Sequence, residues 1–314
     1  MNNRIKIGVV GVGAIGRNHA RIYSESSSAE LTAVFDSDGD AASAIAGQYG
    51  GRAVDTLEEL CELVDAASIA TPTSTHRLVG EALLGAGKHV LIEKPIADSA
   101  EDAKALVRLA AAQNCILQVG HIERFNPVLG EIEARLTDPR FIEVHRLSPF
   151  PNRSIDIGVV LDLMIHDLEI VLHLVKSEVE SIDAVGVPVL TAREDIANVR
   201  IRFKSGCVAN ITSSRISPEK MRKLRVFQRD SYLSLDYQEQ EGELYWKEGM
   251  EIKKQPVSVE KVEPLKRELE AFIDCAIAGR QPAVSGREAT AALELAIDIT
   301  HLIEAGGKPD VFPT

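Results

Sequence analysis

The sequence predicts an α/β Rossmann domain with a parallel, doubly wound sheet over residues 1–121, followed by an α+β domain with an open antiparallel sheet over residues 122–314, whose C-terminal helix can pack back on the first domain. Three observations support this prediction. Apolar runs alternate with helix-like segments up to residue 121, a glycine motif follows the first apolar run, and strand patterns dominate after residue 180. The length of 314 residues is enough for two domains.

The predicted elements of the first domain alternate between strand and helix. The first run, IKIGVVGV, is apolar along its whole length, as in a strand that is covered on both faces. Thr56, followed by acidic residues, has the pattern of a helix N-cap. Strands are expected at 5–12, 30–36, 65–71, 89–95 and 115–121, and helices at 16–26, 43–50, 56–64, 74–87 and 99–114. This alternation favours parallel strands with helices on both faces of the sheet.

The motif GVGAIG at residues 11–16 falls between the first expected strand and the first expected helix. At this place, N–H groups at a helix N-terminus bind the pyrophosphate of a dinucleotide. We expect Gly11 to permit the turn, Gly13 to let the backbone approach phosphate, and Gly16 to let helix and strand pack closely. The alternative is a tight turn with a purely structural role. The predicted cofactor loop consists of Gly11, Gly13, Ala14, Ile15 and Gly16.

Asp36 ends the second expected strand, 20 residues after Gly16. A carboxylate at this place accepts hydrogen bonds from the adenosine ribose and repels a 2′-phosphate, so we expect NAD rather than NADP. No arginine follows closely, which also disfavours NADP. Two alternatives remain: Asp38 takes the ribose role, or Asp36 only opens the acidic loop DSDGD.

The fifth expected strand ends in LIEKP at residues 91–95. Ligands in this fold bind at the carboxyl ends of the strands, so we predict that Glu93 and Lys94 lie beside the nicotinamide end of the cofactor. Pro95 constrains the turn, and the preceding peptide bond can be cis. The alternative is that Lys94 is an ordinary solvated lysine at a strand exit.

The segment GVVLDLMIHDLEIVLHLV at 158–175 has helical spacing. Asp162 and His166 are four residues apart, a spacing that lets a carboxylate orient an imidazole for proton transfer. A structural histidine and a metal ligand are the alternatives, although no third histidine or cysteine lies nearby in sequence. The predicted polar stripe comprises Asp162, His166, Glu169 and His173, and the opposing apolar face comprises Leu161, Ile165, Leu168 and Leu172.

The second half of the chain is rich in strand patterns. In ANVRIRF, Val199, Ile201 and Phe203 share one face and two arginines share the other, as in an antiparallel sheet with one open face. Turns are expected at 204–206 and 229–231. Strands are expected at 180–190, 197–203, 207–214, 223–229, 231–237 and 243–247, and closing helices at 262–279 and 287–305.

Composition narrows the possible functions. The formal net charge of −12 disfavours a nucleic-acid partner, because phosphate backbones require cationic side chains. The four cysteines are scattered singly, which favours reduced thiols in a cytoplasmic protein over a zinc or redox motif. No apolar run reaches the length of a membrane span, so we expect no membrane partner.

Taken together, the motifs resemble those of the Gfo/Idh/MocA oxidoreductase family. The resemblance rests on GVGAIGRNHA, ATPTSTH at 70–76, EKP at 93–95 and DLMIHDLE at 162–169. It implies a large open antiparallel sheet in the second domain, and a lysine, an aspartate and a histidine around a sugar-like substrate; these map onto Lys94, Asp162 and His166. It also implies that Thr71, Pro72 and His76 line the cofactor. Family members commonly have glycine where this chain has Met164, which leaves less room at the helix.

Two further segments are similar to a narrower branch, the UDP-N-acetylglucosamine 3-dehydrogenases. They are GHIERFNP at 120–127 and FPNRSIDIGVVLDLMIHD at 150–167. A diphosphate substrate requires cations, and we predict Arg124 and Arg153 as substrate residues, with Arg146 and Arg193 also available. The alternative is that these arginines are ordinary surface residues. The resemblance also implies a homodimer or homotetramer assembled through the open sheet face.

The residues and the resemblance together predict hydride transfer from a secondary alcohol of a sugar or nucleotide sugar to NAD, and the resemblance implies the 3-hydroxyl of UDP-N-acetylglucosamine as the favoured group. We expect His166 to act as the base and Lys94 to stabilise the alkoxide, although these roles can be exchanged. Asp162 is expected to orient His166 or to hold Lys94. The alternatives are a dehydrogenase of inositol, a free sugar or another polyol, and a catalytically silent NAD-sensing protein.

Overall fold

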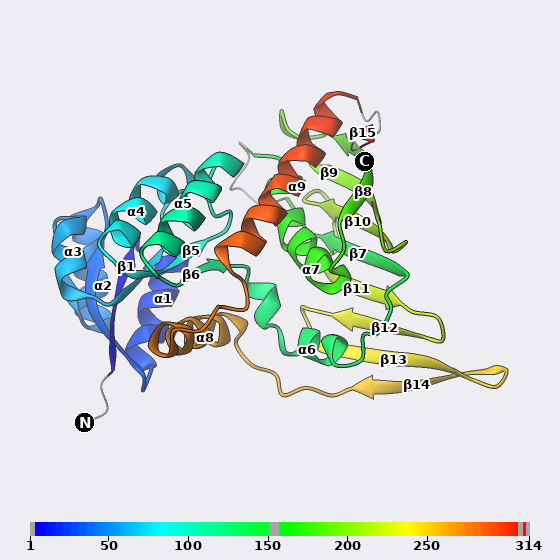
Figure 1. The fold of residues 1–314 in the computed structure, drawn as a ribbon, viewed down its shortest axis with the longest axis horizontal. Helices are drawn as coiled ribbons and strands as arrows, with labels where there is room; N and C mark the ends of the chain where they lie inside the picture. The colour runs from blue at the N-terminus through cyan, green and yellow to red at the C-terminus, as the bar shows by residue number, and fades with distance from the viewer. Residues whose placement is uncertain (1–3, 151–156, 307–309, 312–314) are drawn as a thin grey trace. The chain divides into compact units, whose positions relative to one another are not determined.

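The computed structural model describes residues 4–150, 157–306 and 310–311. The chain divides into two compact units, which Figure 1 shows in ribbon form. Within the described residues, one unit is formed by the chain up to Ile122 together with Glu263–Thr290. The other is formed by Glu123–Val262 and the chain from Ala291 onward. The segment Glu263–Thr290 thus joins the first unit, whereas the sequence placed it after the domain boundary.

The first unit contains a six-stranded parallel sheet in the order β3-β2-β1-β4-β5-β6, which confirms the doubly wound prediction. The strand order reverses between β1 and β4, and ligands of such sheets bind at the carboxyl ends of the strands beside this point. Only the two-residue β3 was not predicted. The strands are β1 (Ile5–Val10), β2 (Ala29–Phe35), β3 (Arg52–Ala53), β4 (Ala66–Ile69), β5 (His89–Glu93) and β6 (Leu117–Gly120).

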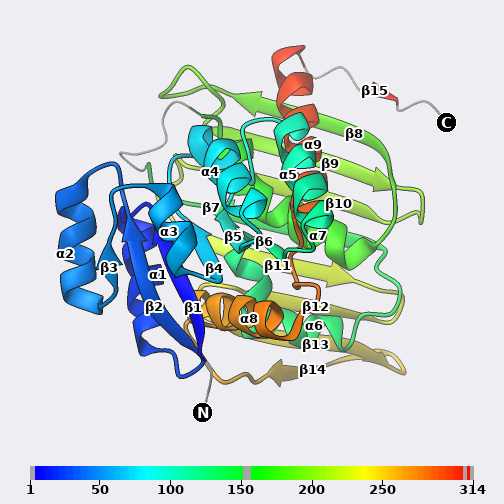
Figure 2. The same ribbon diagram turned by 60° about the vertical axis from the view of Figure 1, so that its left-hand side comes forward.

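Helices cover both faces of this sheet, as Figure 2 shows. The predicted Thr56 cap is confirmed, because its side chain accepts from the N–H of Glu59. The second helix begins earlier than predicted, since Asp38 caps it. The helices are α1 (Ala14–Glu25), α2 (Gly39–Tyr49), α3 (Leu57–Leu63), α4 (Thr73–Gly85), α5 (Ala100–Ala112) and α8 (Pro264–Ala278).

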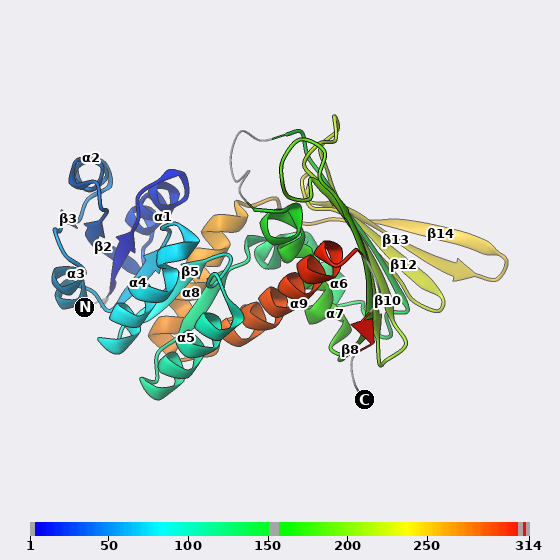
Figure 3. The same ribbon diagram turned by 90° about the horizontal axis from the view of Figure 1, so that it is seen from above.

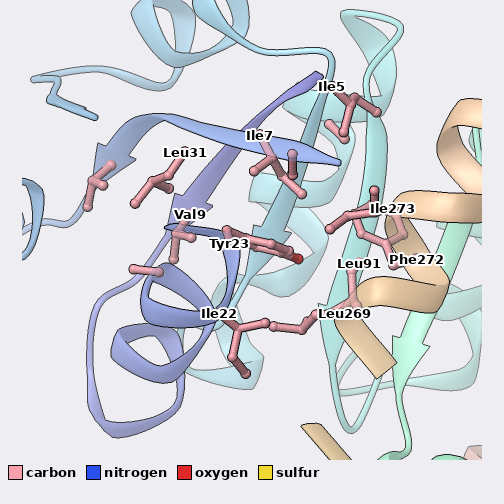
Figure 4. Close-up of a cluster of buried hydrophobic side chains, with 14 of the residues drawn as sticks. Ile5, Ile7, Val9, Ile22, Tyr23, Leu31, Leu91, Leu269, Phe272 and Ile273 are labelled. Atoms are coloured by element: carbon pink, nitrogen blue, oxygen red, sulfur yellow. The ribbon is translucent and has the colours of Figure 1, made fainter. Parts of the chain in front are cut away.

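The core of the first unit includes residues that are far apart in the sequence. Tyr23 and Leu91, from α1 and β5, belong to the same buried cluster as Leu269 and Phe272 of α8. Figure 4 shows these side chains between the sheet and the helix. The predicted apolar spacing of the helix at 262–279 is therefore confirmed, and the side chains it buries complete the Rossmann core.

The second unit contains a nine-stranded sheet in the order β14-β13-β12-β11-β7-β10-β9-β8-β15. All neighbours are antiparallel except β7 and β10. β7, β14 and the two-residue β15 were not predicted, although β7 lies in the middle of the sheet. The strands are β7 (Phe141–Leu147), β8 (Val179–Val187), β9 (Ile196–Phe203), β10 (Val208–Ser214), β11 (Met221–Phe227), β12 (Ser231–Asp236), β13 (Glu241–Glu248), β14 (Glu251–Val257) and β15 (Asp310–Val311).

This sheet has one buried and one open face. Val199, Ile201 and Phe203 of β9 are fully buried and the arginines between them are not, as predicted. Figure 3 shows the helices of this unit on one side of the sheet. They are η1 (Ile122–Phe125), α6 (Pro127–Glu133), η2 (Val160–Met164), α7 (Ile165–Val175) and the later part of α9 (Gly286–Glu304).

Candidate active site

The glycine loop joins β1 to α1 as predicted. Gly11 has a φ of +84°, which side chains rarely adopt, and a Cβ there would lie 2.8 Å from Cγ2 of Thr71. A Cβ on Gly16 would lie 1.8 Å from the carbonyl oxygen of Gly11. A Cβ on Gly13, by contrast, would meet no described atom within 4 Å. The fold therefore requires glycine at 11 and 16, and the space over Gly13 suits the close approach of a ligand.

The N-terminus of α1 is suited to an anion. Its N-cap is Gly13, no side chain in the described parts of the chain caps it, and its first turn holds no acidic residue. The N–H groups of this turn therefore present partial positive charge. Arg17 of α1, which was not predicted as a site residue, lines a cavity of about 380 Å³ together with Val12 and Gly13. These features fit the pyrophosphate of a dinucleotide.

The carboxylate of Asp36, just after β2, binds the glycine loop directly. It accepts hydrogen bonds from the N–H of Val12 at 2.7 Å and from the N–H of Asp38 at 3.0 Å. The side chain of Asp38 accepts instead from the N–H groups of Asp40 and Ala41 at the start of α2. Asp38 is therefore engaged as a helix cap, which favours Asp36 for the predicted ribose contact.

His76 joins the loops that follow β4 and β5. Its buried ring has Nδ1 2.9 Å from the carbonyl oxygen of Pro95 and Nε2 2.9 Å from that of Thr71. Burial lowers the pKa of His76, although the two carbonyl groups act in the opposite direction. His76 thus holds the loop of Thr71 and Pro72 beside the Lys94–Pro95 peptide. A contact of these residues with the cofactor stays a prediction.

Lys94 follows the last residue of β5, and its side chain is half-buried. The Lys94–Pro95 peptide is cis, as the sequence allowed. The carboxylate of Glu93 lies 3.2 Å from Nε2 of the fully buried His19 of α1. Gly120 of β6 makes room for this carboxylate, because a Cβ there would lie 3.0 Å from it.

The first unit therefore brings the predicted cofactor residues to one edge of its sheet. The residues follow the carboxyl ends of β1, β2, β4 and β5, two of which flank the point where the strand order reverses. They are Gly11, Gly13, Ala14, Ile15, Gly16, Asp36, Thr71, Pro72 and Lys94.

Asp162 and His166 lie at the start of a helix in the second unit. The π-helical turn η2 holds Asp162 and continues directly into α7, which holds His166. π-helical turns are rare in proteins as a whole, and those that occur often lie at functional sites. Both side chains are half-buried, whereas Met164 between them is fully buried. Met164 therefore fills the interior of the unit.

Glu194 holds the N-terminus of this π turn. Its buried carboxylate accepts a hydrogen bond from the N–H of Val160 at 3.3 Å, and its carbonyl oxygen accepts from the N–H of Val159 at 2.9 Å. A Cβ on Gly158 would lie 1.8 Å from Oε1 of Glu194. A negative charge at a helix N-terminus is favourable. Glu194 was not predicted as a site residue.

Two buried ion pairs fix α7 within the second unit. Arg146 of β7 donates to both carboxylate oxygens of Asp167, at 2.7 and 2.9 Å, and to Glu123 at 3.1 Å. Arg124 donates to Glu169 at 2.6 Å. Burial lowers the pKa of Arg146, but Asp167 and Glu123 outweigh this effect and hold the pKa above its ordinary value. The guanidinium group therefore stays charged.

The structure separates the members of the predicted polar stripe. Asp162 and His166 are half-buried near the helix start, whereas Glu169 is buried in its ion pair. Nε2 of His173 lies 2.9 Å from Oε1 of Glu133, which supports a packing role.

The predicted apolar face is correct only in part. Ile165 and Leu168 are fully buried, but Leu161 and Leu172 are half-buried. Because the protein encloses α7 on more than one side, the buried set also includes Asp167, Ile170, Val171 and Leu174.

The arginines proposed for a diphosphate have different environments. Arg124 and Arg146 are buried in ion pairs, and Arg193 is exposed and donates to Glu304 at 2.6 Å. Arg153 lies outside the described residues. A substrate role for these arginines stays a prediction. So does the convergence of Lys94 with Asp162 and His166, since these residues belong to different units.

Among the helices that the structure describes, none is long and apolar enough to cross a membrane. Within residues 4–150, 157–306 and 310–311, no group of three or more His, Cys, Asp or Glu side chains is placed to hold a metal ion.

Comparison with known proteins identifies the family. Residues 5–121 match the model of the Gfo/Idh/MocA oxidoreductase family with its NAD-binding Rossmann fold, and residues 129–233 match the Gfo/Idh/MocA C-terminal domain. A UDP-N-acetylglucosamine 3-dehydrogenase from Acidithiobacillus ferrooxidans is 37% identical over 312 residues, which cover 96% of this chain and 98% of that protein. An inositol 2-dehydrogenase from Rhizobium meliloti is 31% identical over 228 residues, 67% of this chain and 69% of that protein.

Solved structures agree with this assignment. A structure of the Acidithiobacillus ferrooxidans dehydrogenase matches with a TM-score of 0.92 at 36% identity, over 97% of this chain and 99% of that chain. A putative myo-inositol dehydrogenase from Sinorhizobium meliloti matches with a TM-score of 0.83 at 26% identity, over 98% of this chain and 100% of that chain. With the parallel sheet, the glycine loop and the open antiparallel sheet, these matches show that the chain belongs to the Gfo/Idh/MocA family of oxidoreductases.

Proposed function

We propose that the protein is an NAD-dependent dehydrogenase that oxidises the 3-hydroxyl of UDP-N-acetylglucosamine. The observation that carries this proposal is the similarity over almost the full length of both chains to a UDP-N-acetylglucosamine 3-dehydrogenase. The identity extends through both units, so it includes the regions that would hold cofactor and substrate. The segment GHIERFNP, which led to the same branch, supplies Glu123 and Arg124 to the buried ion pairs around α7.

We infer that the first unit binds NAD rather than NADP. The first-turn N–H groups of α1 and the open space over Gly13 suit the pyrophosphate. The N–H of Val12 holds the carboxylate of Asp36 against the glycine loop. There the carboxylate would accept hydrogen bonds from the ribose hydroxyl groups, and its negative charge would repel a 2′-phosphate. The bound cofactor supplies the hydride acceptor.

The chain's own residues would control the proton and the developing charge. His166 takes the proton of the substrate hydroxyl as the C–H hydride departs, which leaves a ketone. Asp162, four residues earlier, orients the imidazole and stabilises its charged form. The ammonium group of Lys94 donates a hydrogen bond to the substrate oxygen while negative charge develops there. Lys94 and His166 can exchange the roles of base and electrostatic stabiliser.

We also propose that the open sheet face of the second unit assembles the protein into a homodimer or homotetramer. Four aromatic side chains form a row across this face, with ring centroids 5.6, 5.0 and 4.3 Å apart along the row; the first pair of rings is tilted and the other two pairs are stacked. Aromatic side chains contribute strongly to protein interfaces. The row consists of Phe141, Phe227, Tyr232 and Tyr245.

Inositol oxidation is the second candidate, favoured by the similarity to an inositol 2-dehydrogenase. A panel that measures NADH absorbance distinguishes the two. We expect turnover with UDP-N-acetylglucosamine, slower turnover with other UDP-hexosamines, and none above background with myo-inositol or scyllo-inositol. NADP replaces NAD in a parallel series and is expected to be the poorer cofactor. Preferential turnover of an inositol would overturn the proposed substrate, and tight NAD binding with no turnover of any alcohol would favour a sensor.

A further inference from the structure

The first unit holds a group of buried polar side chains on the sheet face that α1 and α8 cover. They come from two helices and three neighbouring strands, and Glu268 is contributed by α8, more than 140 residues from the rest of the group. Only Glu93 is partly exposed, at 18% of its side chain. The group consists of His19, Tyr23, Ser68, Glu93, Gln118 and Glu268.

Several of these side chains are paired. The hydroxyl groups of Tyr23 and Ser68 are hydrogen-bonded to each other. Nε2 of His19 lies 3.2 Å from Oε1 of Glu93, although neither ring nitrogen of His19 has a hydrogen bond of good geometry among the described residues. The amide Nε2 of Gln118 donates to the main-chain oxygen of Glu268 at 3.1 Å, which places this amide group beside α8.

Three buried oxygen atoms of the group lack a hydrogen-bond partner among the described residues. They are the two carboxyl oxygens of Glu268 and Oε1 of Gln118. Glu268 is 0% exposed. Buried polar atoms in proteins are almost always hydrogen-bonded, to protein or to ordered water. A carboxyl group that is enclosed in this way therefore needs an explanation.

The electrostatics favour a neutral carboxyl group at this position. Burial raises the pKa of Glu268 well above its ordinary value, and the nearby carboxylate of Glu93 raises it further. The other titratable groups of the cluster are His19, beside Glu93, and Tyr23, whose pKa is raised by burial. Among the described residues, no cationic side chain offsets these two effects on the pKa of Glu268.

We propose that Glu268 carries a proton and, with Gln118, encloses an ordered water molecule that links it to Glu93. Glu268 would donate its proton to the water, and the water would donate to Oε1 of Gln118 and to the carboxylate of Glu93. Three polar partners are typical for a buried water molecule. Glu268 and Glu93 interact electrostatically without a direct hydrogen bond, as a bridging water requires.

Glu268 is therefore a positioning residue for the strand end that carries Lys94, an assignment that rests on the proposed function. Glu93 directly precedes Lys94; its carboxylate lies 3.2 Å from Nε2 of His19, and the water would bind it from the other side. His19 belongs to α1, whose N-terminus is the glycine loop. The buried group thus connects the loop expected to hold the pyrophosphate with the lysine expected to stabilise the alkoxide.

Infrared spectroscopy of the full-length protein tests the proton directly. We expect a carbonyl stretching band of a protonated carboxylic acid at neutral pH that disappears in Glu268→Gln. Glu270→Gln is the matched control, because Glu270 is two residues further along the same helix and is exposed. The control is expected to keep the band. A wild-type spectrum without this band, or a band that persists in Glu268→Gln, would overturn the assigned proton.

The pH dependence of thermal unfolding gives an independent measurement. A carboxyl group whose pKa is raised by folding binds more protons in the folded than in the unfolded protein, so stability falls as the pH rises from the unfolded pKa towards the folded one. Glu268→Gln removes this loss. The melting temperature of Glu268→Gln relative to the wild type should therefore increase between pH 5 and pH 8, about the range above the ordinary glutamate pKa. A constant difference across this range contradicts the proposal.

Activity tests the positioning role. Glu268→Gln keeps an N–H donor and should keep kcat within about threefold, whereas Glu268→Leu loses the donor and should lower kcat about tenfold. Both variants are checked for folding by circular dichroism and for NAD binding by titration. Equal kcat for Glu268→Leu and the wild type would overturn the positioning role. If the wild type oxidises none of the tested alcohols, the proposed function fails, while the infrared and pH measurements still decide the state of Glu268.

Discussion

Lys94 and His166 are both half-buried, an exposure that lets a side chain meet a substrate while it is shielded from bulk water. Their neighbours along the chain are paired within their own units. Glu93 lies against His19, and Asp167 accepts hydrogen bonds from Nε and Nη2 of Arg146. The two reactive candidates therefore project from backbone that is fixed by adjacent buried contacts.

Replacing either reactive candidate should reduce catalysis much more than cofactor binding. We expect His166→Ala to lower kcat by about 10²–10⁴-fold through loss of proton transfer. Lys94→Ala should lower it by about 10²–10³-fold, because the developing alkoxide loses its cationic partner. The kcat values are measured with the substrate that the panel identifies, and NAD binding is titrated separately.

His173→Ala is the matched control on the same helix, since His173 contacts Glu133 instead. Near wild-type kcat values for both Lys94→Ala and His166→Ala would rule out the proposed mechanism.

The place of a functional residue could be predicted from the sequence only where that residue belongs to a local motif. The glycine loop, Asp36 and Lys94 follow strands in a fixed order, so their placement at one sheet edge was predictable. Glu268 and Glu194 carry no local signal. Their environment depends on contacts with segments that are distant in the sequence, such as the amide of Gln118 against the main chain of Glu268.

At the scale of elements, α7 is held by charges rather than by apolar packing alone. Its predicted amphipathic pattern is broken by Asp167 and Glu169, both buried, and each has an arginine partner from outside the helix. The π turn that precedes it could not be predicted from spacing, because the same residues are compatible with an α-helix. The central strand β7 was also missed. Its sequence alternates, but Arg146 points to the buried face where an apolar residue is expected.

Breaking the Arg146 ion pairs should destabilise the second unit strongly. Arg146→Met leaves the carboxylates of Asp167 and Glu123 without this buried partner, and we expect the free energy of unfolding to fall by about 3–5 kcal/mol. The measurement is urea unfolding followed by circular dichroism.

Arg225→Met is the control, because Arg225 pairs with Glu143 on the same sheet but is exposed. It should cost no more than about 1 kcal/mol. Equal losses in the two variants would show that the buried network contributes no more than a surface ion pair.

At the scale of the whole molecule, the two sheets expose different surfaces. The parallel sheet of the first unit is covered by helices on both faces, whereas the nine-stranded sheet has helices of its unit on one face, as Figure 3 shows. The fold class was predictable because the alternation of strand and helix patterns along the sequence indicates a parallel sheet. The membership of α8 in the first unit was not, since its apolar stripe is compatible with any apolar surface.

The aromatic row on the open face is the place to test assembly. Tyr232 stacks on both Phe227 and Tyr245, so a glutamate at position 232 would put a charge in the middle of the row. If this face joins subunits, Tyr232→Glu should lose at least about 2 kcal/mol of association free energy, about a 30-fold increase in the dissociation constant. Sedimentation velocity over a range of concentrations measures this change.

The control for assembly is Ile277→Glu, which places the same charge on α8, where the isoleucine is 55% exposed and lies outside the nine-stranded sheet. It should sediment like the wild type, which is expected to be a dimer or a tetramer. A monomeric wild type at micromolar concentration would exclude assembly through the open face. Dissociation of both variants would place the interface elsewhere, because only one of the two substitutions alters the aromatic row.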